Sequence, residues 1–123
     1  MGCRGARSWT LGLVFGLAAT WILIAMFVPG IPLFLLLAVP FLLQSRHRLA
    51  AAGAILLAMA VHFAYFEWTG VERCAEMNRR PNASCQTYGV ETTVVAIGLL
   101  GLAGVALTIT GALAAGRAAS RDG

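Results

Sequence analysis

Residues 92–115 read TTVVAIGLLGLAGVALTITGALAA, a stretch without a single ionisable side chain. A helix needs about 20 apolar residues to cross the hydrocarbon core of a bilayer, because each residue adds about 1.5 Å to its length. This stretch is longer than that. The sequence therefore predicts a membrane-spanning helix over about residues 91–115.

Three more apolar runs lie upstream, and they predict helices over about residues 9–28, 31–45 and 49–68. Apolar residues make up 59% of the chain and charged residues only 11%, against roughly a quarter charged in a soluble domain. So little polar surface cannot cover a water-soluble globule. We therefore expect residues 1–123 to form a single all-α integral membrane domain, a four-helix transmembrane bundle.

The second run is short for a membrane span. Residues 31–43 would reach only about 20 Å as a helix, and Pro40 lies inside them. Two interpretations follow. The run either re-enters the membrane and returns to its own side, or crosses it with Gln44 and Ser45 as its polar end.

The arginine positions favour the second interpretation. With a cytoplasmic N-terminus, a crossing second run leaves six arginines in the cytoplasm and three outside, whereas a re-entrant run leaves five and four. Because cytoplasmic loops carry the excess of positive charge, we expect four crossings with both termini cytoplasmic. The exterior arginines would be Arg73, Arg79 and Arg80.

The polar segment 69–90, on the expected exterior side, contains Cys74 and Cys85. Cysteine pairs form disulfides in oxidising compartments, so we expect a disulfide-closed exterior loop. Two alternatives that give the cysteines a more specific function have less support. A redox-active pair usually has C-x-x-C spacing, and a metal site that adds Met77 and His62 would match no known ligand spacing. We expect no bound metal.

Small residues recur every three or four positions in the first and last runs. Gly12 and Gly16 share one face of the first helix, and Gly101 and Gly104 share a face of the last. Small residues let membrane helices approach closely. These faces are expected either to pack the four helices together or to join two copies of the chain.

His62 is the one titratable residue well inside an expected helix. Ionisable groups inside a membrane are costly and point first to function, although a neutral histidine can also serve packing. Glu91 begins the next helix at the same outer boundary. If the two side chains meet, they would form an ionisable pair at the outer mouth of the bundle.

The sequence lacks the motifs that mark common classes of enzyme. The sequence contains no nucleotide-binding loop, no H-E-x-x-H motif and no nucleophile elbow, so we expect neither enzymatic activity nor a cofactor. The net charge of +4 comes from arginines scattered at the ends of the apolar runs. This pattern suits lipid headgroups rather than nucleic acid.

In length and helix count the chain resembles the small multidrug transporters, but residues 9–28 lack the acidic residue which that family carries in its first membrane helix. Basic residues that are all arginine, together with abundant alanine, indicate a GC-rich bacterial genome. The leading interpretation is a non-enzymatic accessory or structural subunit of the bacterial inner membrane. Its partners would be the bilayer and either another membrane protein or a second copy. The alternative is a small oligomeric transporter or channel that uses His62 and Glu91.

Overall fold

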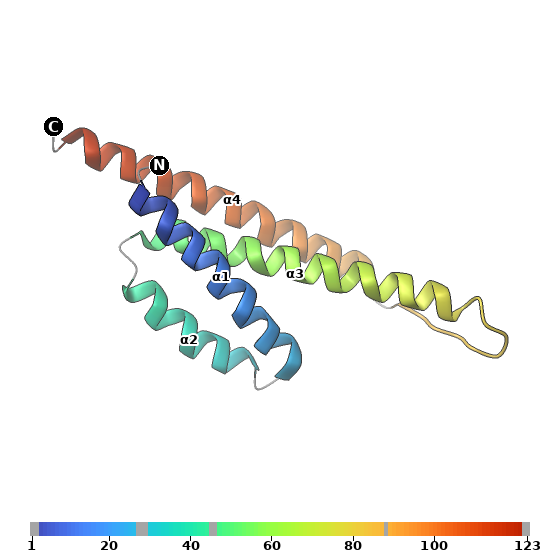
Figure 1. The fold of residues 1–123 in the computed structure, drawn as a ribbon. Helices are drawn as coiled ribbons and strands as arrows, with labels where there is room; N and C mark the ends of the chain where they lie inside the picture. The colour runs from blue at the N-terminus through green and yellow to red at the C-terminus, as the bar shows by residue number, and fades with distance from the viewer. Residues whose placement is uncertain (1–2, 27–29, 45–46, 88, 122–123) are drawn as a thin grey trace.

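The computed structural model describes the chain except for residues 1–2, 27–29, 45–46, 88 and 122–123. The described part is all-helical and contains four helices (Figure 1). They are α1 (Cys3–Met26), α2 (Gly30–Gln44), α3 (Arg48–Met77) and α4 (Val90–Arg121).

Helix α3 is central, with α1 against one side and α4 against another (Figure 1). Gly12 of α1 lies against Ala51, and Gly16 lies against Ile55, so α1 and α3 run parallel. In α4, by contrast, Gly111 lies against Ala50 and the earlier Gly104 against Leu57, so α4 runs antiparallel to α3.

Helix α2 lies along α1 and runs antiparallel to it. Gly30, at its start, contacts the backbone of Leu23, and further along Phe41 stacks on Phe15 with ring centroids 4.5 Å apart. α2 thus carries the chain back along α1, from the level of Leu23 past that of Phe15. A segment that returned to its own side would instead leave α3 antiparallel to α1.

Three of the helices are long and apolar enough to cross a membrane, over Ala6–Ala25, Arg48–Met77 and Val90–Ser120, whereas α2 is a shorter apolar helix. Large apolar side chains cover much of the outside. Leu36 of α2 is 69% exposed and Leu102 of α4 is 71% exposed. Soluble monomers rarely expose large contiguous apolar surfaces, so this exterior is compatible with a membrane protein.

The expected end of the third helix at Trp68 was wrong, because α3 continues nine residues further to Met77. Glutamate, arginine, alanine and methionine, which dominate residues 71–77, all favour helix. The first residue that cannot donate a backbone hydrogen bond is Pro81. The connecting loop is therefore residues 78–89 rather than 69–90, and Cys74 lies on the helix.

The other boundaries also differ from the expected ones. α1 begins at Cys3 rather than residue 9, and α4 ends at Arg121 rather than residue 115. Both extensions are polar or alanine-rich turns that continue an apolar helix. A hydropathy pattern marks where a helix would leave lipid, and the helix itself continues until its residues disfavour it.

Candidate functional site

The glycine face of α1 packs within the chain. A Cβ atom on Gly12 would lie 2.8 Å from the carbonyl oxygen of Ala51, and one on Gly16 would lie 2.9 Å from the Cα of Ile55. Only glycine permits this approach of two backbones. The α1–α3 contact is thus made by glycines on one helix and small residues on the other.

The glycines of α4 differ in how closely they approach α3. A Cβ on Gly104 would lie 3.0 Å from the carbonyl oxygen of Gly53, so the two helices are in close contact there. Gly101 has only the Cβ of Ala60 nearby, at 4.0 Å. Gly98, one turn earlier, has nothing within 4 Å. The close part of the α3–α4 contact therefore lies toward the C-terminal half of α4.

The hydroxyl groups between these helices bond mainly to their own backbone. Thr20 is fully buried and donates to the carbonyl oxygen of Gly16 at 2.6 Å. Thr108 donates to the carbonyl oxygen of Gly104 at 2.8 Å and accepts a bond from Trp9 Nε1 at 3.4 Å. In the described part of the chain, every buried side-chain nitrogen or oxygen has a hydrogen-bond partner.

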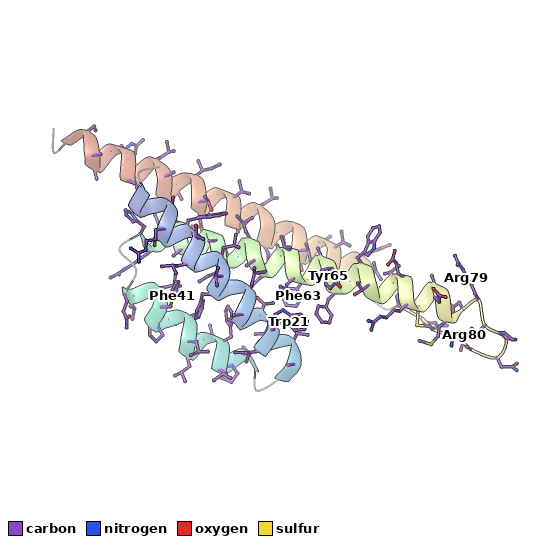
Figure 2. The ribbon with its side chains drawn as sticks, in the orientation of Figure 1. Trp21, Phe41, Phe63, Tyr65, Arg79 and Arg80 are labelled. Atoms are coloured by element: carbon purple, nitrogen blue, oxygen red, sulfur yellow. A yellow bond between two sulfur atoms is a disulfide. The ribbon has the colours of Figure 1, made fainter. Side chains whose placement is uncertain are left out.

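His62 turns toward α1. It lies one helical turn beyond Ala58, on the face of α3 that contacts Gly16, and its half-buried ring meets Trp21 edge-on with centroids 5.2 Å apart. Trp21 points from α1 toward α3 (Figure 2) and also makes an edge contact with Phe66. His62 is therefore part of an aromatic cluster between α1 and α3.

Glu91 lies elsewhere, exposed in the first turn of α4. Because Gly104 contacts Leu57 and the helices are antiparallel, Glu91 lies near the level of Gly70. That level is about 12 Å along α3 from His62, at 1.5 Å per residue. Among the described residues, no hydrogen bond or ion pair joins His62 to Glu91. The structure does not bring the two side chains together.

Cys74 and Cys85 form the disulfide that the sequence predicts, with their Cα atoms 5.2 Å apart. Asn78 reinforces it with two hydrogen bonds to the backbone of Cys85. Its Nδ2 donates to the carbonyl oxygen at 3.0 Å, and its Oδ1 accepts from the backbone N–H at 2.7 Å. Asn78 was not predicted from the sequence, although asparagine directly after a helix is a common turn residue.

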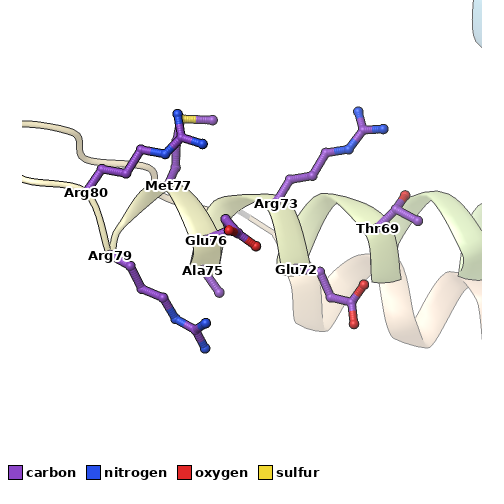
Figure 3. Close-up of a pocket in the computed structure, with 8 residues that line it drawn as sticks. All are labelled: Thr69, Glu72, Arg73, Ala75, Glu76, Met77, Arg79 and Arg80. Carbon is purple, nitrogen blue, oxygen red and sulfur yellow. The ribbon is translucent and has the colours of Figure 1, made fainter.

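The end of α3 carries mixed charge around a surface hollow of about 670 Å³ (Figure 3). Arg73 and Arg80 point to one side of the helix, whereas Glu72 and Arg79 point to the other. In the described part of the chain, no group of three histidine, cysteine, aspartate or glutamate side chains could hold a metal ion. The lining of this hollow thus presents charged groups of both signs.

The two ends of the molecule differ in charge. We call the end that holds the loop 78–89 the disulfide end and the opposite one the basic end. All described carboxylates belong to the disulfide end: Glu67, Glu72, Glu76 and Glu91. The basic end combines the start of α1, the α2–α3 junction and the end of α4. Its described arginines and histidine are Arg4, Arg7, His47, Arg48, Arg117 and Arg121.

Comparisons with known proteins find no matching family, no matching curated protein and no matching solved structure.

Proposed function

We propose that the protein is a small polytopic membrane protein that crosses the bacterial inner membrane four times, with both termini in the cytoplasm. Its role would be that of a non-enzymatic accessory or structural subunit. The disulfide end projects outside the membrane, where it meets partners.

The topology is supported by the parallel course of α1 and α3 together with the charge difference between the ends. If α1 and α3 cross in the same direction, α2 must return the chain across the membrane between them. The basic end, where five of the eight described arginines lie, then lies in the cytoplasm, as the positive-inside rule favours.

The projection outside the membrane follows from helix length. The apolar part of α3 ends near Phe66, and Arg80 lies fourteen residues further along the chain. Eleven of those residues are helical, which raises the end of α3 about 16 Å above the hydrocarbon boundary at 1.5 Å per residue. Figure 2 shows Arg79 and Arg80 at the far end of α3, away from α1 and α2. A side chain at that height reaches proteins more readily than lipid headgroups.

The observation that carries the structural role is the packing of α3 on both neighbours by glycine and alanine contacts. The hydroxyls among them are bonded to backbone of their own helix. Such an interior favours a fixed bundle over a polar conduction path. The transporter alternative needs an ionisable pair, and His62 instead packs against Trp21.

Membrane extraction tests the proposal. Membranes from cells that express the chain should retain it through an alkaline carbonate wash and release it only into detergent. Recovery of the protein in the carbonate wash would contradict membrane integration.

A further inference from the structure

A second hollow, of about 350 Å³, lies between α3 and α4 at the disulfide end. It forms because the two helices diverge toward that end. A Cβ on Gly104 would lie 3.0 Å from the carbonyl oxygen of Gly53, whereas one on Gly98 would meet nothing within 4 Å. Beyond the hollow, the disulfide between Cys74 and Cys85 ties the segment that leads into α4 to the end of α3. The hollow is thus bounded by close packing on one side and by a covalent bond on the other.

The helix register gives the levels of the two walls. Gly111 contacts Ala50 and Gly104 contacts Leu57, so α3 and α4 advance by equal numbers of residues in opposite directions. Continuing this register pairs three lining residues of α3 with three of α4: Ala64 with Ile97, Glu67 with Val94, and Val71 with Val90. These levels span about 10 Å at 1.5 Å per residue. Because the apolar part of α3 ends near Phe66, the first level lies on the membrane side of Glu67 and the third on its aqueous side.

The rim of the hollow is acidic. Of the described residues that line it, Glu67 and Glu72 are the charged ones and none is basic. The lining surface is almost entirely apolar, so the methylene groups of the two glutamates form part of the wall and their oxygens lie at its rim. Within the described ranges, neither carboxylate makes a hydrogen bond or an ion pair. Arg73 points to the other side of α3 from Glu72 (Figure 3). The negative charge at the rim is therefore available to a ligand.

We propose that this hollow binds a compact organic cation, an ammonium group that carries apolar substituents. Its charge would lie at the rim near Glu67 and Glu72, and its substituents would lie against the apolar walls on both sides of Glu67. Trp68, which also lines the hollow, adds an indole, the aromatic ring that attracts ammonium groups most strongly. The inference goes beyond the proposed structural role, because it assigns a ligand to the disulfide end.

Charge and shape together specify this class of ligand. A volume of about 350 Å³ is at the small end of the range for ligand pockets, so a compact molecule fits and a partner helix, about 10 Å across, does not. An inorganic cation would leave the apolar walls in water. A phospholipid would bring its phosphate to two carboxylates. A cation surrounded by apolar groups matches both the rim and the walls.

Titration of the full-length protein in a neutral detergent, followed by NMR of the tryptophan indoles, tests the inference. Tetrabutylammonium should shift the indole signal of Trp68 and leave those of Trp9 and Trp21, which belong to α1, in place. Tetramethylammonium has the same charge without the long chains, and tributylphosphine oxide has three of the chains without the charge. Each should bind about tenfold more weakly, the loss expected when several buried methylene groups or two exposed ion pairs are removed. Equal affinity for either control compound would overturn the proposal.

A pair of double variants tests the two carboxylates. Glu67→Gln combined with Glu72→Gln should weaken the binding of tetrabutylammonium about tenfold, since each exposed ion pair contributes up to about fivefold. Glu76→Gln combined with Glu91→Gln removes the same charge from the same end, at residues outside the lining of the hollow. This control should change the affinity less than about threefold, because its carboxylates do not border the ligand. Equal losses in the two double variants would indicate general surface charge and overturn the site.

A second pair of variants keeps the charge constant. Ala64→Phe should fill the membrane side of the hollow and weaken binding, whereas Ala96→Phe, at an exposed residue that does not line it, should bind as the wild type does. Unchanged binding by Ala64→Phe would overturn the placement of the ligand between α3 and α4. The outcome is separable from the membrane assignment, because a chain that resists carbonate extraction but binds no organic cation refutes only this site.

Discussion

Gly16→Ala tests the contact on which the arrangement of α1 and α3 depends. A Cβ at this position would lie 2.9 Å from the Cα of Ile55 and 2.9 Å from the Cβ of Ala58. Non-bonded carbon atoms pack best at about 3.5–4.0 Å. The helices would therefore have to separate by roughly 0.6 Å, and the backbone of Ile55 cannot rotate away as a side chain could.

The magnitude follows from two opposing effects. Overpacking a close contact costs about 1–3 kcal/mol, while replacing a helical glycine by alanine gains about 0.5–1 kcal/mol. We expect Gly16→Ala to lower the free energy of unfolding by up to about 2.5 kcal/mol, the largest difference between those terms. Gly98→Ala is the matched control, because nothing lies within 4 Å of its added Cβ, and it should stabilise the protein.

The assay is denaturant titration in mixed micelles, followed by circular dichroism, for the wild type and both variants. The two substitutions make the same chemical change, so opposite signs would come from the environment alone. If Gly16→Ala stabilises the protein as much as Gly98→Ala does, α1 does not pack on α3 through this face.

Other expected outcomes address the loop, the histidine and the association state. Mass spectrometry of a non-reduced digest should show Cys74 and Cys85 linked and Cys3 unpaired; two free loop thiols in freshly isolated protein would exclude the disulfide. Asn78→Ala should speed hydrogen exchange at the Cys85 amide and cost about 1 kcal/mol, the usual net value of such hydrogen bonds, whereas unchanged exchange would show that Asn78 does not hold the loop. His62→Phe preserves a ring against Trp21, so its melting temperature should stay close to wild type and proton flux into proteoliposomes should be the same in both; a pH-dependent flux lost in the variant would restore the transporter alternative. Gly16→Leu should lower the melting temperature in detergent by several degrees, and unchanged melting with loss of a cross-linked dimer would identify the glycine face as a contact between copies.

The sequence was sufficient for the number of helices and for the disulfide, because both follow from local signals. Charge-free runs such as residues 92–115 have the length and composition of a candidate membrane helix. Cys74 and Cys85 stand in one polar segment, where a pair is expected to oxidise. The ends of the helices were harder to predict from the sequence. Glu67 and Glu72 interrupt the apolar pattern of α3, yet glutamate and arginine continue a helix readily, and α3 ends only at Met77.

The rotation of each helix about its axis could not be read from the sequence. Glu91 appeared to be the natural partner of His62 because both lie near the outer boundary. In α3, however, Ala54, Ala58 and His62 follow one face at intervals of four residues, and that face contacts α1. Which glycine face meets which helix is decided by pairwise packing of the whole bundle, and a periodic pattern on one helix does not contain that information.

Cysteine accessibility on either side of α2 tests the four-crossing topology most directly. A membrane-impermeant maleimide would be applied to two sets of right-side-out vesicles. One set carries the variant Gln44→Cys, with the other cysteines removed, and the other set carries the native protein after reduction. If α2 crosses the membrane, Gln44→Cys should stay unlabelled until the vesicles are opened, whereas Cys85 of the reduced protein should react at once. Immediate labelling of Gln44→Cys together with protection of Cys85 would contradict it, because α2 would then return to its own side and α3 would cross in the opposite direction.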